Sequence, residues 1–360
     1  MAKPRPYIPD IGKAVVKNVA VPDGRPVINL SLNESSFGVS PLAAEAAQQR
    51  CERLYRYPDP ASTDLRAVIG ERFDLDPDRI VCGNGSEELL DLIGRLYARP
   101  GDEILFAEHA FLAFSIVAMR VGATPVRAPA PGFVTDVDAL LERVTDNTRV
   151  VFLDNPNNPC GTYIPAEEVK RLRDGLPDHV VLVIDSAYAE YVDKPDYTDG
   201  LEFVAGTENV IVTRTFSKAY GLAALRIGWG YCSASMAGVI NRMRAIGNVN
   251  AIAQAAVAGA LEDQEFVRGV RDATNRERQK LTDAFTAMGL AVTPSVTNFL
   301  IVRFPDTGNH RAGAAYAHLI RNGIIVREVT DYGLDDYLRF TIGRPEENDA
   351  VIEALGRFMV

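Results

Sequence analysis

Five short, continuous apolar runs separated by helix-like stretches constrain the fold more than any other feature of this chain. The runs are RIVCG (79–83), DEILF (102–106), RVVFL (149–153), VVLVI (180–184) and NVIVT (209–213). Stretches with helical spacing lie between them, such as SEELLDLIGRLYA and PAEEVKRLRDGL. Strands that are apolar throughout are typically buried on both faces. The sequence therefore predicts an α/β domain with a mostly parallel sheet covered by helices on both sides.

The pattern changes after residue 262. Residues 264–290 form a long, charged helical stretch of the kind that bridges two domains. Shorter strand-like segments follow, at 298–304, 323–329 and 337–343, and a helical tail closes the chain. Because 360 residues are many for one core, we expect two domains. The large α/β domain is predicted at 46–262, and a smaller α+β domain combines 1–45 with 263–360.

Charge and composition narrow the class of protein. The net charge of −10 argues against a nucleic-acid or anionic-membrane surface. No apolar stretch approaches the ~18 residues of a membrane span, and the N-terminal residues lack a signal-peptide core. The four cysteines form no C-x-x-C pair, which is typical of a reducing compartment. We expect a cytoplasmic protein without nucleic-acid or membrane partners.

Four of the predicted strands are followed at once by polar stretches. These are GNGSEE (83–88), DNPNNPCG (154–161), DSAYAEY (185–191) and TRTFSK (213–218). In open α/β sheets, ligands bind outside the carboxyl ends of the strands. The four stretches therefore predict one binding site that contains an acid, amides, hydroxyls and a lysine.

Each stretch has a chemical interpretation and an ordinary one. Gly85 and Ser86 open a helix whose free N–H groups favour an anion, although a Ser-capped helix needs no ligand. Asp185 follows five apolar residues, so its carboxylate needs a cation, which a ligand or an arginine can supply. The Asn-Pro pairs of DNPNNPCG hold their asparagines in fixed geometry, but they also suit a plain turn.

Lys218 connects these features. A lysine beside a packed strand is costly unless its amine is paired or used chemically. Pyridoxal phosphate needs an amine for its aldehyde, an acid for its pyridine nitrogen, donors for its phenolic oxygen and a phosphate cradle. The four stretches supply all of these, and Thr215, Ser217 and Arg226 add donors for the phosphate. We therefore expect pyridoxal 5'-phosphate as the cofactor.

Other kinds of site are not supported. The four histidines lie far apart without H-E-x-x-H spacing, so we expect no metal site. There is no G-x-S-x-G elbow and no P-loop. Glu88 stands where the dinucleotide fingerprint G-x-G-x-x-G needs its third glycine, which argues against a nucleotide-dependent dehydrogenase.

Nine motifs follow one another along essentially the whole chain: SLNESSFGVSP, YRYPDP, GNGSEELL, DNPNNPCGT, DSAYAEY, TFSKAYGLAALRIG, NVN, GIIVRE and YLRFTIG. Together they resemble the fold-type-I, class I/II pyridoxal-phosphate aminotransferases, and most closely the histidinol-phosphate aminotransferase family. The resemblance implies a large, mostly parallel-sheet domain with a smaller α+β domain. It also implies ping-pong transfer between a small-molecule amino donor and a keto acceptor, in a homodimer with shared active sites.

The resemblance implies a role for each matching residue. Lys218 and Asp185 would be catalytic, with Lys218 bound to the cofactor and Asp185 beside its pyridine nitrogen. Phe114 would stack on the cofactor ring, and Tyr57 would reach the cofactor phosphate of the neighbouring subunit. The other cofactor contacts would be Gly85, Ser86, Glu87, Asn158, Tyr188, Thr215, Ser217 and Arg226. Substrate contacts would be Arg339 for a carboxylate, Arg327 for a phosphate, and Asn33 and Phe37.

The chain departs from the family pattern near the expected substrate site. Phe37 replaces a tyrosine of N-E-N-P-Y-G-P-S-P, Cys160 replaces the threonine of N-P-T-G, and EHAFLAF (108–114) lacks the usual tyrosines. The expected reaction joins histidinol phosphate and imidazole-acetol phosphate with glutamate and 2-oxoglutarate. An aromatic amino acid aminotransferase and a phospho-amino-acid decarboxylase remain alternatives on the same scaffold. The intact Lys218 and Asp185 argue against a non-enzymatic binding protein.

Overall fold

The computed structural model describes residues 27–306 and 308–360. Its seven-stranded sheet has the order β2-β8-β7-β6-β5-β3-β4. β8 runs antiparallel to the other six strands, which are parallel to one another. The strands are β2 (Ile80–Gly83), β3 (Glu103–Ala107), β4 (Thr124–Ala128), β5 (Thr148–Asp154), β6 (Val181–Asp185), β7 (Val210–Thr215) and β8 (Gly228–Tyr231). The five predicted apolar runs are therefore all strands of one mostly parallel sheet.

Two strands of the seven-stranded sheet were not predicted from the sequence. β4 reads TPVRA and lies at the edge of the sheet, where its side chains are only partly buried. β8 reads GWGY, and glycine is unfavourable in strands. A Cβ on Gly228 would lie 2.3 Å from the Ser86 amide nitrogen. The missing side chain therefore allows the start of a helix to approach β8 closely.

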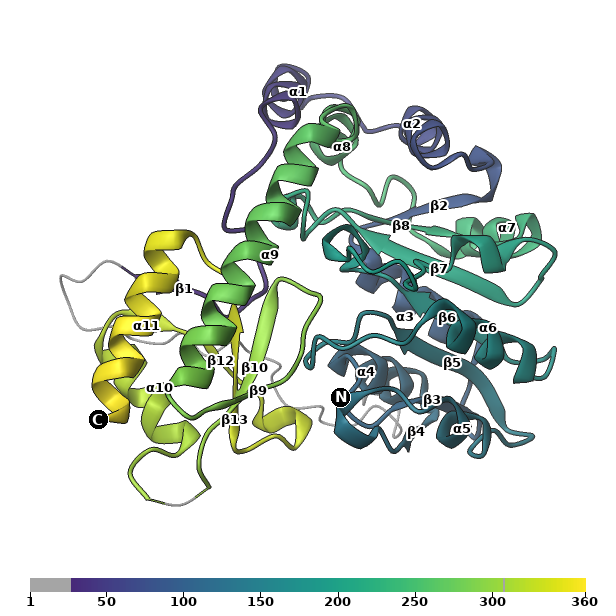
Figure 1. The fold of residues 1–360 in the computed structure, drawn as a ribbon. Coiled ribbons are helices and arrows are strands. Elements are labelled where there is room, and N and C mark those ends of the chain that lie inside the picture. The colour runs from purple at the N-terminus through teal and green to yellow at the C-terminus, as the bar shows by residue number, and fades with distance from the viewer. Residues whose placement is uncertain (1–26, 307) are drawn as a thin grey trace, which may run out of the picture.

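Helices cover both faces of the sheet, as predicted (Figure 1). Within β3, Ile104 and Phe106 belong to one hydrophobic cluster and Leu105 to another, and β5 alternates in the same way. The helices of this part are α1 (Pro41–Cys51), α2 (Thr63–Phe73), α3 (Ser86–Tyr97), α4 (Leu112–Val121), α5 (Val137–Leu141), α6 (Ala166–Gly175), α7 (Ala234–Met243) and α8 (Ala251–Glu262). Short 3-10 helices are η1 (Pro77–Arg79), η2 (Pro131–Phe133), η3 (Ala189–Tyr191), η4 (Leu201–Val204) and η5 (Ala223–Leu225).

The C-terminal part contains a second, smaller sheet with its own helices. Its four-stranded antiparallel sheet, β12-β13-β10-β9, contains β9 (Ala291–Val292), β10 (Phe299–Arg303), β12 (Arg327–Glu328) and β13 (Tyr337–Thr341). The helices are α9 (Gln264–Ala287), α10 (Ala312–Arg321), η6 (Thr330–Tyr332) and α11 (Pro345–Met359). In Figure 1, α9 runs from α8, beside the large sheet, to the small sheet. This long helix matches the predicted bridge at 264–290.

One predicted strand is divided. The segment 323–329 forms β11 (Ile324–Ile325), which pairs in parallel with β1 (Ile28–Asn29), and then β12, which pairs with β13. Residues 28–30 thus pack with the C-terminal part of the chain, and Leu30 belongs to its hydrophobic cluster. The boundaries at 45/46 and 262/263 stay a prediction, and residues 1–26 lie outside the described residues.

No helix within the described ranges is long and apolar enough to cross a membrane. The same ranges contain no group of three or more His, Cys, Asp or Glu side chains placed to hold a metal ion.

Candidate active site

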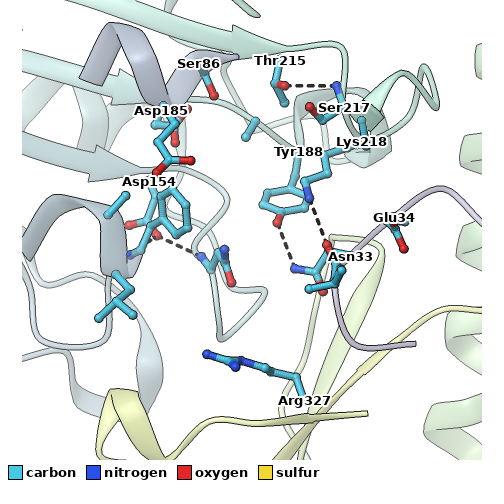
Figure 2. A pocket seen from close by; sticks show the side chains of 18 of the residues that line it. Asn33, Glu34, Ser86, Asp154, Asp185, Tyr188, Thr215, Ser217, Lys218 and Arg327 are labelled. Carbon is cyan, nitrogen blue, oxygen red and sulfur yellow. Dashed lines mark hydrogen bonds between the residues drawn. The ribbon is translucent and has the colours of Figure 1, made fainter. Parts of the chain in front are cut away.

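A cavity of about 580 Å³ opens at the carboxyl ends of β5, β6 and β7, where the large sheet faces the small domain (Figure 2). Most of the predicted site residues line it, although they come from distant parts of the chain. They are Asn33, Ser86, Glu87, Asn158, Asp185, Tyr188, Thr215, Ser217, Lys218, Arg226, Arg327 and Arg339. The cavity is lined by neither Gly85, Phe37, Phe114 nor Tyr57.

Lys218 follows β7 and is half-buried. Its Nζ donates a hydrogen bond of 3.3 Å to the Leu32 carbonyl oxygen and lies 5.8 Å from the centre of the Tyr188 ring. Burial, together with the positive charge of Arg339, lowers the pKa of Lys218 to about 8. The uncharged amine, the form that a nucleophile or a base must have, is therefore far more populated near neutral pH than in an ordinary lysine.

Asp185, the last residue of β6, is only 4% exposed. The Thr213 hydroxyl donates a 2.8 Å hydrogen bond to its Oδ1. Burial raises the pKa of Asp185 to about 6, against the opposing effects of Thr213 and Lys218. A buried carboxylate without an ion-pair partner among the described residues fits a protonated ring nitrogen, whose charge would stabilise the ionised acid.

The start of α3 forms the predicted anion cradle. Gly85 precedes the helix with a φ of 84°, and a Cβ there would lie 2.8 Å from Nη2 of Arg226. Glycine therefore allows the guanidinium to lie against the helix N-terminus, where free N–H groups collect. Thr215 and Ser217 lie beside it, joined by a 3.1 Å bond from the Ser217 amide to the Thr215 hydroxyl. This donor set suits a phosphate.

Asparagine and tyrosine side chains hold the next part of the cavity. Tyr188 Oη accepts a 3.0 Å hydrogen bond from Asn33 Nδ2, and Asn158 Oδ1 accepts one of 2.6 Å from Arg339 Nη1. Asn33 has a φ of 55° and also bonds Thr341 through its backbone and side chain. Asn33 is thereby bonded to residues that follow the large sheet and to β13 of the small sheet.

Arg339 and Arg327 lie on neighbouring strands of the small sheet. Their Cα atoms are direct cross-strand partners in β13 and β12. Arg339 is buried, bonds the Ser31 carbonyl at 3.0 Å, and has an Nε with no partner among the described residues. Arg327 is partly exposed and lies across the cavity from Asp185 and Ser86 (Figure 2). Together the two guanidinium groups suit an anionic substrate.

Phe114 requires a correction. It is fully buried and stacks on Phe152, with ring centroids 4.5 Å apart, so it belongs to the core beneath α4. The aromatic side chain that lines the cavity in this region is Phe111, the residue before the first turn of α4. One helical turn separates the two, and of the pair only Phe111 lines the cavity.

Two other predicted residues lie away from the cavity of the single chain. Phe37 is half-buried against the core of the large domain. Tyr57 is 97% exposed. The predicted contact of Tyr57 with a neighbouring subunit therefore stays a prediction.

Asp154 is a cavity residue that sequence reasoning treated only as part of a turn. Its Oδ2 accepts hydrogen bonds from the amides of Phe111 and Asn158 and from Asn157 Nδ2, at 2.9–3.1 Å, while Oδ1 is buried without a partner in the described residues. Burial, with a smaller contribution from Asp185 on the neighbouring strand, raises the pKa of Asp154 to about 8 against the lowering effect of its backbone hydrogen bonds. The signal was present, because Asp154 follows an apolar run as Asp185 does.

The chain is similar to aminotransferases over its whole length. A histidinol-phosphate aminotransferase of Rhodopseudomonas palustris (strain HaA2) is 48% identical over 357 residues, covering 99% of this chain and 98% of that protein. The crystal structure of histidinol-phosphate aminotransferase from Sinorhizobium meliloti, in complex with pyridoxal-5'-phosphate, matches with a TM-score of 0.88 at 30% identity, over 93% of this chain and 92% of that one.

A more distant structure shares the fold alone. Aspartate aminotransferase from Thermus thermophilus with maleate matches with a TM-score of 0.82 at 22% identity, over 92% and 91% of the two chains. The family model for aminotransferase class I and II matches residues 25–355. These matches confirm the predicted fold type and family, and the chain belongs to the aminotransferases of class I and II.

Proposed function

We propose that this protein is a pyridoxal-phosphate-dependent aminotransferase that converts histidinol phosphate and 2-oxoglutarate into imidazole-acetol phosphate and glutamate, and the reverse. The observation that carries the proposal is the convergence of Lys218 and Asp185 on one cavity, with an anion cradle at one end and two arginines at the other. The full-length relatives named histidinol-phosphate aminotransferases favour this reaction over the aromatic and decarboxylase alternatives.

The cavity residues fit the parts of the cofactor. Lys218 would bind its aldehyde carbon, Asp185 its ring nitrogen, and Asn158 and Tyr188 its phenolic oxygen. The phosphate would bind at the start of α3, held by Ser86, the Glu87 amide, Thr215, Ser217 and Arg226. When bound, pyridoxal phosphate supplies an electron sink that stabilises negative charge at the substrate Cα.

The protein side chains supply the proton chemistry. With its lowered pKa, Lys218 is suited to accept the proton from the substrate Cα and to return it on the other side of the reaction. The ionised carboxylate of Asp185 would keep the ring nitrogen protonated, because it is buried and has no ion-pair partner among the described residues. Burial of both groups excludes water and strengthens their electrostatic effect.

The two arginines provide for the anionic groups of both substrates. Arg339 is buried, with guanidinium donors directed at Asn158 and Ser31, which fixes its orientation for a carboxylate. Arg327, nearer to solvent, suits the phosphate of histidinol phosphate. Because one cavity binds both substrates in turn, each arginine would contact different anions in the two half-reactions.

We further propose that the active enzyme is a homodimer in the cytoplasm. Large apolar side chains are exposed in the segment after α1, at Leu54, Tyr55 and Tyr57, and Ile246 is 93% exposed. Arg244 bonds the Pro60 carbonyl at 2.7 Å, so the two segments lie side by side. Such a cluster is typical of a surface that another chain covers, and a second copy would bring Tyr57 to the other active site.

Absorption spectra of the purified, cofactor-loaded protein test the function. L-Glutamate is expected to bleach the visible band of the lysine-bound cofactor, and 2-oxoglutarate to restore it. Histidinol phosphate is expected to bleach it with a second-order rate constant about 10²-fold above that of L-phenylalanine, since a site with charged partners for a phosphate rejects substrates that lack one. Preference for L-phenylalanine, or carbon dioxide release from threonine phosphate, would support an alternative instead.

A further inference from the structure

An acidic side chain forms an ion pair with the arginine pair of the cavity. Arg327 and Arg339 are cross-strand partners, and like charges placed opposite each other are unfavourable. The hydrogen-bond acceptors of Arg339 are the neutral oxygens of Asn158 and Ser31. Arg327 forms an ion pair with Asp331, through Nη2 and Oδ2. Asp331 is therefore a carboxylate that offsets part of the charge of the pair.

The ion pair is accessible, yet Asp331 has its own support. The side chains of Arg327 and Asp331 are 29% and 35% exposed, so a ligand anion can approach the guanidinium. Asp331 belongs to η6, and Tyr332 is the last residue of this short helix. The carbonyl oxygen of Tyr332 lies 3.1 Å from His109 Nδ1, within hydrogen-bond distance. Backbone bonds of Tyr332 and Leu334 to the Val329 carbonyl also hold η6. The loop is thus fixed without the ion pair.

The charge of Asp331 affects anions unequally. The Coulomb energy of a ligand is proportional to its charge, so a doubly charged phosphate feels any change of potential twice as strongly as a singly charged carboxylate. If the proposed function holds, the same cavity must bind a phosphate in one half-reaction and carboxylates in the other. With two uncompensated arginines, the phosphate compound would be retained and would exclude the carboxylate substrate.

We propose that Asp331 is an internal counter-ion of Arg327 that evens out the affinity of the cavity for phosphate and carboxylate substrates. A bound phosphate displaces or shares the Asp331 carboxylate, and Asp331 pairs with Arg327 again when the phosphate leaves. Asp331 is in this sense a specificity-determining residue, since it acts on the substrate through Arg327.

Binding of two simple anions to the cofactor-loaded protein tests this role. Dissociation constants of inorganic phosphate and acetate are measured at pH 8 for the wild type, Asp331→Asn and Asp331→Glu. An exposed ion-pair charge changes affinity about threefold for each unit of ligand charge. Asp331→Asn should therefore tighten phosphate binding about tenfold and acetate binding about threefold. Asp331→Glu keeps the charge and should keep the wild-type ratio.

Matched measurements separate this inference from its alternatives. Glu353→Gln removes the acid of another i,i+4 pair, Arg357–Glu353 on α11, and should change neither constant. Weaker or unchanged phosphate binding in Asp331→Asn would show that Asp331 only orients Arg327, and equal gains for both anions would also overturn the proposal. The glutamate half-reaction is followed on the same samples. If the wild type does not carry out amino transfer, the proposed function is refuted. The role of Asp331 is decided separately, by how the ratio of the phosphate and acetate dissociation constants changes in Asp331→Asn.

Discussion

The cavity has an inner wall and a rim that are built in different ways. The inner wall consists of Asp154, Asp185 and Tyr188, which end or follow adjacent strands and are all buried. The rim consists of Arg226 and Arg327, which are exposed or partly exposed. Tyr57 stands outside both, on the open surface. The inner wall is complete within one chain, whereas the rim has donors still available for a ligand or a second chain.

The difference follows from the physics of burial. A buried carboxylate costs several kcal/mol unless it has a partner, so the sheet must place the inner wall accurately and keep it in place. Exposed arginines stay hydrated and lose little when their partner changes. We therefore expect substitutions in the inner wall to act strongly on chemistry and stability, and those outside it to act weakly and on binding.

Asp185→Asn should have the largest effect. It removes the negative charge that would keep the ring nitrogen protonated, and loss of one such electrostatic group lowers the rate about 10²–10³-fold. The measurement is the single-turnover rate of the L-glutamate half-reaction. Asp196→Asn, at an exposed carboxylate that accepts a bond from Tyr163, is the control and should react at the wild-type rate. A rate within threefold of wild type for Asp185→Asn would place the acid outside the chemistry.

Asp154→Asn should have an intermediate effect, on stability. The pKa of Asp154 is raised from 3.8 to about 8 in the folded state, so folding favours its protonated form. The contribution of Asp154 to the unfolding free energy of the cofactor-free protein should therefore be most favourable below pH 4. It should be lost progressively as the pH rises from 4 to 8. Between pH 6 and pH 8 the variant should remove about 2 kcal/mol of that loss.

Urea unfolding at pH 6 and pH 8 checks this prediction. The raised pKa of Asp185, about 6, affects mainly the range below pH 6, so the difference between wild type and Asp154→Asn over this interval reports on Asp154. An equal pH dependence in both proteins would mean that the three N–H donors keep Asp154 ionised throughout.

Tyr57→Phe should have the smallest effect. Loss of one hydroxyl donor to a phosphate weakens cofactor affinity about tenfold without changing the fold. Pyridoxal phosphate titration of the cofactor-free protein measures it, with Tyr55→Phe as the control at a neighbouring exposed tyrosine. If the affinity is unchanged while sedimentation shows a dimer, Tyr57 does not reach the cofactor site.

The sequence was informative wherever one strand determined the position of one residue. Asp185 and Lys218 each follow an apolar run, so the parallel sheet alone brings them to one edge. β4 and β8 were missed because an exposed edge and two glycines obscure the strand pattern. Phe114 was misplaced because the choice between it and Phe111 depends on where α4 begins, which an apolar stretch without a polar N-cap does not mark.

Contacts between distant segments were beyond the sequence. The bonds of Asn33 to Tyr188 and Thr341 join three parts of the chain, and no local pattern indicates them. The ion pair of Arg327 with Asp331 has an i,i+4 spacing, but it lies on a strand and a short helix rather than on one helix. Spacing alone therefore gave no reason to pair them.

Covalent attachment of the cofactor tests the central claim most directly. Borohydride reduction of the cofactor-loaded protein fixes a C=N bond as a stable amine, and peptide mass spectrometry then locates the modified residue. We predict that the cofactor is found on the peptide containing Lys218 and that Lys218→Ala carries no modification, while L-glutamate added before reduction prevents the labelling. Attachment to another lysine, or labelling that persists in Lys218→Ala, would contradict the account.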